Sequence, residues 1–507
     1  MPRRPKAKDG LTAGQRVALY ESQLEEKRKS MRSASAGDEP VTDMAEKAQM
    51  VTEEKAPKKA KVLPKPQYAT VNVDLSLKLG EVKPLHGMCN GPKSYGADIT
   101  DLFREIGVPY VRFDCTDTAV SAYAVDISRI FKSFANDPTD PESYDFAVTD
   151  SYVEAAMLTG AKVIFRLGES VDLVSGIKKA IPESSETLAR VCVNIIRHYN
   201  EGWANGYTFG IDCFEIWSYS GEDKDGELGL YRSLANSIKL YDEDIRLGGM
   251  SFPLGGGAVR DFLRYCKKNN LPLDFVSVDC FASDPETVGA DIESLIMLMR
   301  NLGFDKTELI IGKWCYADSD ALEGSTFEKV VCGRAGEQKR ALLEAQRGVK
   351  GASFAAAFML RLMNCDLKTA CFYDAQPMVS PFCSIADRFG NALKPYYAFK
   401  SFGELYRTRN SVWVESQQTE GMAHTGIYAG AAVSDDGKGY IMLSSFKGCG
   451  VIDLRIDGLS SDIYTADIYM LDGVKDMSLA DSVPISGMKK RLLLNVSEYG
   501  VIMIKLY

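Results

Sequence analysis

Hydrophobic and polar positions change their pattern twice along the chain, which divides it into three regions. Residues 1–66 are rich in Lys, Glu, Ala and Ser and nearly lack aromatic residues, with only a weak helical stripe from Thr12 to about Ser33. Residues 67–405 alternate short apolar runs with longer amphipathic segments, whereas residues 406–507 contain alternating segments alone. The pattern predicts a disordered or partly helical extension, an α/β domain and an all-β domain.

The middle region contains eight short apolar runs that predict strands. They are His86–Cys89, Val111–Phe113, Lys162–Leu167, Cys213–Trp217, Ile245–Gly249, Asp274–Val278, Glu308–Gly312 and Ala370–Tyr373. Between them lie helical candidates such as Ile99–Ile106, Glu186–Tyr199, Leu228–Leu240 and Lys339–Arg347. Eight strand–helix repeats over about 250–350 residues are typical of a (β/α)8 TIM barrel.

The last region predicts a β-sandwich of roughly 100 residues. Its alternating segments include Gly439–Ser444, Ile463–Met470, Arg491–Val496 and Val501–Leu506. The strand-like segment Tyr68–Leu79, which precedes the barrel, is a candidate to join this sandwich.

Composition and charge narrow the class of protein. A hydrophobic fraction of 45% with 25% charged residues excludes collagen-like, coiled-coil and wholly disordered chains. The net charge of −9 divides unevenly, because residues 1–65 carry +5 and the remainder carries −14. The acidic body argues against a general nucleic-acid binder. The basic extension has two interpretations, a disordered tail or a tether to an acidic protein or surface.

The twelve cysteines are scattered, mostly inside apolar runs, and form no CxxC pair. This pattern favours buried thiols over disulfides or a zinc ribbon. We found no apolar signal segment, no run long enough to span a membrane, no Walker-type loop and no metal-ligand cluster. The sequence therefore predicts a cytoplasmic protein with no cofactor, no metal and no membrane span.

In a TIM barrel, chemistry sits where strands end, on the C-terminal face. The polar residues at the predicted strand ends are Asp114, Arg166, Glu169, Ser218, Tyr219, Asp279, Lys313, Tyr373 and Asp374. A ring of acids, bases and phenols suits a sugar, whose hydroxyls need many directed donors and acceptors. We expect a carbohydrate or another small ligand at this face.

Four stretches resemble glycoside hydrolase family 39, the β-xylosidase and α-L-iduronidase group. They are Ile106–Asp114, Phe165–Ser170, Ile196–Gly206 with Phe214–Trp217, and Lys394–Tyr406. They occur in the order of the family, and the resemblance extends over nearly all of residues 67–507. It implies a barrel with a catalytic glutamate at the end of the fourth strand and another at the end of the seventh.

Both of those glutamates are replaced in this chain. The family's fourth strand ends in Glu-hydrophobic-Trp-Asn-Glu-Pro, but residues 215–220 read Glu-Ile-Trp-Ser-Tyr-Ser. Tyr219 therefore stands at the acid/base position, and Ser218 replaces the Asn that would bind the sugar 2-hydroxyl. The seventh strand of the family ends in Glu-Trp, and Lys313 stands at the nucleophile position. Two family sites that usually carry His are Asp114 and Asp279 here.

These replacements are unfavourable for hydrolysis. A Tyr with a pKa near 10 is a poor acid at neutral pH, and an ammonium repels an oxocarbenium-like transition state. The leading hypothesis is a catalytically inactive family-39-like protein that binds carbohydrate or serves as a scaffold. Lys313 has three interpretations: a buried ion pair with Asp114 or Asp279, a grip on an anionic ligand, or catalysis. Trp217 and Trp314 have two interpretations, barrel packing or sugar stacking. We interpret His198 as structural.

Three other functions remain open. The first is an active O-glycosyl hydrolase of β-xylosidase type, with Glu222 as substitute acid and Glu169, Asp114 or Asp279 as nucleophile. The second is a lyase that forms a Schiff base on Lys313. The third places the function in the basic extension.

Overall fold

The computed structural model describes residues 67–94, 96–114, 124–170, 184–221, 223–318, 336–377, 382–417, 426–448, 450–459, 463–486 and 489–507. The extension of residues 1–66, with the helix expected between Thr12 and Ser33, lies outside these residues. The same holds for Glu222.

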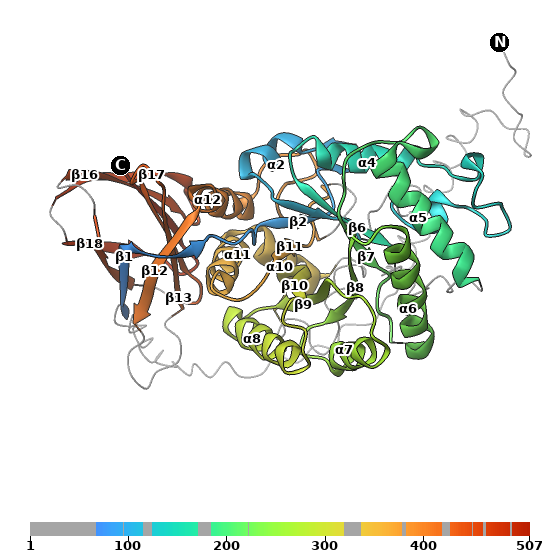
Figure 1. Ribbon diagram of the computed structural model, residues 1–507. Coiled ribbons are helices and arrows are strands. Elements are labelled where there is room, and N and C mark those ends of the chain that lie inside the picture. Colours follow the sequence, from blue (N-terminus) through green and yellow to red (C-terminus); the bar gives the residue numbers. More distant parts are fainter. Residues whose placement is uncertain are drawn as a thin grey trace, which may run out of the picture. The chain divides into compact units, whose positions relative to one another are not determined.

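Eight parallel strands close into a barrel, as the sequence predicts. The strands are β2 (Gly87–Cys89), β5 (Tyr110–Arg112), β6 (Lys162–Leu167), β7 (Cys213–Ile216), β8 (Arg246–Pro253), β9 (Phe275–Ala282), β10 (Glu308–Tyr316) and β11 (Thr369–Phe372). Pairing of β11 with β2 closes the ring. Each expected apolar run overlaps one of these strands, so the predicted TIM barrel is confirmed (Figure 1).

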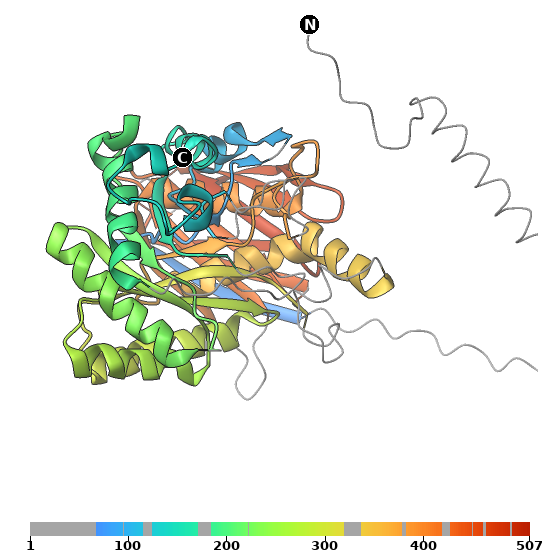
Figure 2. The ribbon, with the colours of Figure 1, turned by 90° about the vertical axis from the view of Figure 1, so that its right-hand side faces the viewer.

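Helices cover the outside of the barrel, as Figure 2 shows for the green and yellow-green segments. They are α2 (Thr100–Ile106), α4 (Ala147–Met157), α5 (Ser185–Glu201), α6 (Lys224–Tyr241), α7 (Gly257–Asn269), α8 (Pro285–Asn301), α10 (Glu337–Arg347), α11 (Val349–Leu362) and α12 (Lys394–Thr408). Side-chain caps fix several starts: Ser184, Asp223 and Asp284 accept hydrogen bonds from backbone N–H groups in the first turns of α5, α6 and α8. The described residues of this region also contain shorter elements: β3 (Lys93–Ser94), β4 (Ala97–Asp98), α3 (Ile127–Ile130), η1 (Pro141–Ser143) and η2 (Trp203–Asn205).

Helix α11 lacks a polar face, and its surroundings explain why. Eleven of its fourteen residues are buried. It contacts barrel strand β10 on one side and β13 (Ile427–Val433) and β14 (Gly439–Ser445) on the other. A helix that is apolar all round needs this double cover.

The second domain is a nine-stranded, mostly antiparallel sheet with its own apolar core. Besides β13 and β14 it contains β1 (Gln67–Glu81), β12 (Asn410–Gln417), β15 (Gly450–Asp457), β16 (Ile463–Leu471), β17 (Asp476–Ser486), β18 (Lys489–Val496) and β19 (Val501–Leu506). Strand β1 pairs antiparallel with β12 and parallel with β15, so the strand that precedes the barrel in sequence belongs to this sheet (Figure 1). The predicted C-terminal β-sandwich is confirmed.

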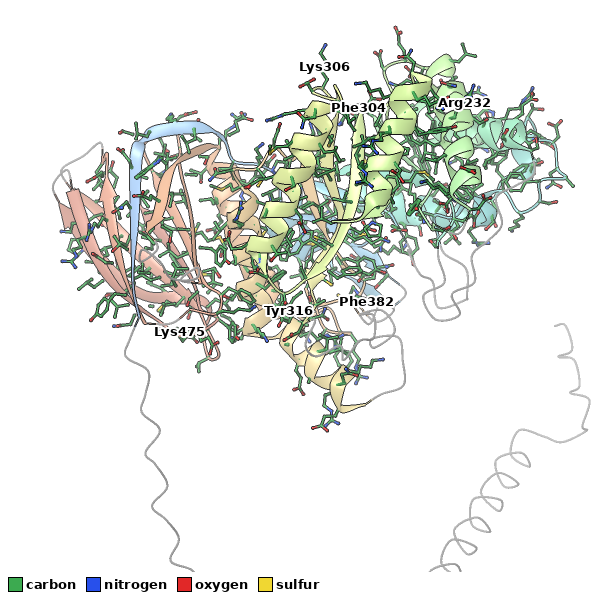
Figure 3. The ribbon with its side chains drawn as sticks, turned by 90° about the horizontal axis from the view of Figure 1, so that it is seen from below. Arg232, Phe304, Lys306, Tyr316, Phe382 and Lys475 are labelled. Carbon is green, nitrogen blue, oxygen red and sulfur yellow. The ribbon has the colours of Figure 1, made fainter. Side chains whose placement is uncertain are left out.

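The direction of β10 identifies the two ends of the barrel. Figure 3 labels Phe304 and Lys306, which precede β10, at one end, and Tyr316, where β10 finishes, at the other. Phe382, in the segment after β11, lies at the same end as Tyr316. We call this C-terminal end the mouth.

Among the helices of the described residues, none is long and apolar enough to cross a membrane.

Candidate functional site at the barrel mouth

Lys313, at the predicted nucleophile position, forms an ion pair inside the mouth. Its Nζ contacts Asp114 Oδ2 and lies 3.6 Å from Asp279 Oδ2. The three side chains come from different strand ends, after β5 and within β9 and β10. The Lys313 and Asp279 side chains are 17% and 19% exposed, whereas Asp114 is 1% exposed. The geometry is that of the ion-pair interpretation, with two carboxylates on one ammonium.

Arg166 connects Asp114 to a second acidic group. Its Nη1 lies 2.8 Å from Asp114 Oδ1 and its Nη2 lies 2.8 Å from Asp126 Oδ1. Nη1 also donates to Ser218 Oγ at 3.2 Å, and Nη2 donates to Ser170 Oγ at 2.8 Å. Since the guanidinium is fully buried, these partners supply the compensation that a buried charge requires.

Arg112 and Glu215 form the deepest part of the network, and the sequence reasoning did not single them out. Arg112 Nε donates to Glu215 Oε2 at 2.9 Å, and Nη1 donates to Asp114 Oδ2 at 3.2 Å. A Cβ at Gly312 would lie 3.1 Å from Arg112 Cζ, so glycine lets the guanidinium pass close to β10. The available signal was strand alternation, which puts Arg112 on the same face as Asp114, two residues later.

Three cations surround Asp114, and they determine its protonation state. Burial opposes ionisation of this carboxyl, but the positive charges of Lys313, Arg166 and Arg112 outweigh it and hold its pKa well below the usual range. Asn90 also holds Asp114 in position, because its Nδ2 donates a hydrogen bond to the backbone carbonyl of Asp114 at 2.6 Å. Asp114 is therefore ionised in the folded protein at neutral pH and is held in place from several sides.

Asp126 and Glu169 form a second acidic pair beside Arg166. Burial raises the pKa of Asp126 to about 6, with the Glu169 charge adding to the effect and Arg166 opposing it. Glu169 Oε1 and Oε2 accept hydrogen bonds from the backbone N–H and hydroxyl of Ser128 at 2.7 and 2.8 Å. Glu169, a candidate nucleophile from sequence, is thus held against α3.

Tyr219, at the predicted acid/base position, lies after β7 and is partly buried. Its ring packs on Phe252, with centroids 5.0 Å apart, and its backbone N–H donates to the carbonyl of Met250 at 2.6 Å. These contacts fix Tyr219 to the end of β8. No hydrogen bond of its hydroxyl is present within the described part of the chain.

Trp217 and Trp314 lack the exposed ring face that a sugar-binding platform requires. Trp314 is fully buried and stacks on Phe358, with ring centroids 3.9 Å apart and an interplanar angle of 12°. Its ring also meets Phe372 and Phe399, between the barrel wall and its helices. Trp217 is 5% exposed. Of the two interpretations of Trp314, barrel packing or sugar stacking in a ligand site, the structure therefore has the packing one.

Tyr373 and Asp374 follow β11 and are both buried. Lys313 Nζ lies 5.6 Å from the centroid of the Tyr373 ring, within cation–π range. Asp374 accepts hydrogen bonds from the backbone and side chain of Gln376, at 3.3 and 3.2 Å. Tyr373 is thus part of the Lys313 environment, whereas Asp374 bonds with its own loop.

A cavity of about 480 Å³ opens beside Lys313. It lies among the ends of β8, β9 and β10 and the start of α8, with Lys313, Asp279 and Tyr373 among its lining residues. Of the predicted polar ring, the partly exposed members are Lys313, Asp279, Ser218 and Tyr219. These are the side chains that a ligand can touch, while the buried charges behind them hold Lys313 in place. Within the described residues, no group of three His, Cys, Asp or Glu side chains is arranged to hold a metal ion.

No family model matches the chain. Solved structures with a similar fold include a glucosidase from Croceicoccus marinus, at 20% sequence identity and a TM-score of 0.69, with 87% of this chain and 99% of that chain covered. The GH39 enzyme from Xanthomonas axonopodis pv. citri is similar at 13% identity and a TM-score of 0.59, covering 89% and 99%. A monomeric β-xylosidase from Caulobacter crescentus is similar at 14% identity and 0.59, covering 86% and 99%. The fold of residues 67–507 is therefore that of these glycoside hydrolases.

Proposed function

We propose that this protein binds carbohydrate at the mouth of its glycosidase-like barrel and does not hydrolyse glycosidic bonds. The observation that carries the proposal is the ammonium of Lys313, which contacts Asp114 and lies 3.6 Å from Asp279. From the resemblance to family 39, a nucleophilic carboxylate is expected at this position.

The electrostatics of the pair oppose a retaining mechanism. Such a mechanism needs one carboxylate to attack the sugar and a second group to protonate the leaving oxygen. Asp114 is fully buried behind Lys313, so attack on a sugar would require the ion pair to open. An ammonium in the pocket also raises the energy of a cationic transition state.

Relocated carboxylates are the alternative route to hydrolysis, and their contacts argue against it. Glu169 has both oxygens bonded to Ser128, and Asp279 Oδ1 accepts a hydrogen bond from Ser251 Oγ at 2.6 Å. The Schiff-base alternative requires Lys313 to lose its proton. Two adjacent carboxylates favour the charged form of a lysine and so disfavour that step.

The binding half of the proposal rests on the chemistry of the exposed groups. Lys313 can donate hydrogen bonds and Asp279 can accept them. The hydroxyls of Ser218 and Tyr219 can do both. A sugar needs this mixture of donors and acceptors around a concave site. These groups lie at the C-terminal end of the barrel, which is the end where TIM-barrel enzymes have their active sites.

Two measurements on the full-length protein test the proposal. Hydrolysis is followed with aryl β-xylosides and related aryl glycosides, and binding is followed by calorimetry with the corresponding free sugars. We expect binding without turnover above the uncatalysed rate. Turnover that disappears in Lys313→Ala or Tyr219→Phe would show an active hydrolase instead.

Lys306→Ala is the matched control for Lys313→Ala. Lys306 is exposed and lies at the opposite end of the barrel (Figure 3). Loss of sugar binding in Lys313→Ala but not in Lys306→Ala assigns binding to the mouth, and equal binding in both variants places it elsewhere. Borohydride trapping with a panel of keto compounds tests the lyase alternative, which an adduct at Lys313 would establish.

A further inference from the structure

The cavity beside Lys313 has an electrostatic character of its own. Its lining includes two acids, Asp279 from β9 and Asp291 from α8, and one base, Lys313. Because Lys313 also contacts Asp114, its single positive charge is shared between two carboxylates. The lining therefore carries a negative balance even with Lys313 included.

Asp291 is the acid that the network at the mouth does not compensate. Within the described residues it makes no ion pair and no hydrogen bond, and a Cβ on Gly255 would lie 3.6 Å from its Oδ2. Burial raises the pKa of the neighbouring Cys280 thiol, and the charges of Asp279 and Asp291 raise it further. The negative charges of Asp279 and Asp291 are therefore both felt at Cys280, in the lining of the cavity.

The rest of the lining is mainly apolar. Leu254, Phe281 and Val288 form walls, and Tyr373 contributes an aromatic ring. The volume of about 480 Å³ falls within the range of about 300–1,000 Å³ that is usual for small-molecule sites. A carboxylate next to apolar walls selects for a compact ligand that carries a positive charge, since an anion would be repelled and a neutral ligand would leave the charge unpaired.

We propose that this cavity takes a sugar-sized ligand bearing a protonated amine, with the ammonium against Asp291 and Asp279 and the ring against Phe281 and Tyr373. This inference deepens the proposed function, on which it rests, because it names the class of sugar as cationic.

Calorimetry of the full-length protein with glucosamine, glucose and glucuronate tests the inference, because these monosaccharides are similar in size and differ in charge. We expect glucosamine to bind about tenfold more tightly than glucose, and glucuronate to bind most weakly. Asp291→Asn should reduce the preference for glucosamine to about threefold or less, because it removes the charge that favours the ammonium over a neutral hydroxyl. Thermal unfolding of the variant checks that it is folded.

Asp305→Asn is the matched control, since Asp305 is exposed and lies between Phe304 and Lys306, at the far end of the barrel. Equal affinities for glucosamine and glucose, or a preference that survives Asp291→Asn, would overturn the inference and leave the proposed function standing. If none of the three sugars binds, the proposed function fails. Cyclohexylamine and cyclohexanol then test the amine site alone: binding of the amine that is lost in Asp291→Asn supports it, and no binding overturns it.

Discussion

The two sides of the mouth use the same residue types for different purposes. On the side of β5, β6 and β7, Arg112, Asp114, Arg166 and Glu215 are fully buried and bonded to one another. On the side of β9, β10 and α8, the charged groups are partly exposed and border a cavity. Charges that are satisfied internally fix a shape, whereas charges that face a cavity are available to a ligand. Lys313 belongs to both sides, because it contacts Asp114 and lines the cavity.

The largest expected effect comes from the buried side. Arg112→Leu leaves Glu215 and Asp114 with fewer compensating charges in the barrel interior, and we expect the free energy of unfolding to fall by about 3–5 kcal/mol. Urea unfolding followed by tryptophan fluorescence measures it. Arg104→Leu is the control, since Arg104 pairs with Asp101 at the surface and should change stability by less than about 1 kcal/mol. A small effect of Arg112→Leu would mean that the network does not hold the mouth together.

Lys313→Met tests the residue that joins the two sides. It removes one of the three cations around Asp114 but leaves Arg112 and Arg166, so we expect a smaller loss of about 2 kcal/mol. The same urea unfolding experiment applies, with Lys306→Met as control. Unchanged stability would separate Lys313 from the structural network and assign it to the ligand alone.

The pH dependence of stability should follow Asp114. Its pKa is lowered in the folded protein, so its ionised form contributes stability above the unfolded pKa of about 4, and the contribution disappears as pH falls towards the folded value. We expect the free energy of unfolding to decrease between about pH 5 and pH 2.5, and to decrease less steeply in Asp114→Asn. Equal slopes in both proteins would contradict this assignment. Asp101→Asn, a change at an exposed acid, is the control.

Asp291→Asn should have the smallest effect on stability. Because Asp291 makes no ion pair within the described residues, we expect a change of less than about 0.5 kcal/mol. Thermal unfolding of the variant alongside the wild type measures it. A loss of more than about 1 kcal/mol in the free energy of unfolding would indicate that Asp291 supports the fold, as the buried charges on the other side of the mouth do.

The fold follows from the sequence because it depends on local periodicity. Apolar runs such as Lys162–Leu167 and Glu308–Gly312 coincide with β6 and β10, and the alternating segments near the C-terminus coincide with sandwich strands. Helix α11 was not predicted, because a helix buried on two faces has no polar stripe for periodicity to detect. Strand-end positions also identified Asp114, Arg166, Asp279 and Lys313, which the barrel brings together.

What the sequence determined by itself is therefore the barrel and the sandwich, whereas the assignment of Tyr219 and Lys313 to the positions of the family's catalytic glutamates stays a prediction. Only the tertiary structure decided which charges pair, since Arg112 meets Glu215 103 positions away and Lys313 meets Asp114 from a non-adjacent strand. It also decided that Trp314 packs on Phe358 rather than facing the mouth. The physical reason is range: backbone periodicity is set by neighbours in sequence, whereas the pairing of charges and the volume of a cavity depend on side chains that meet only after the barrel closes.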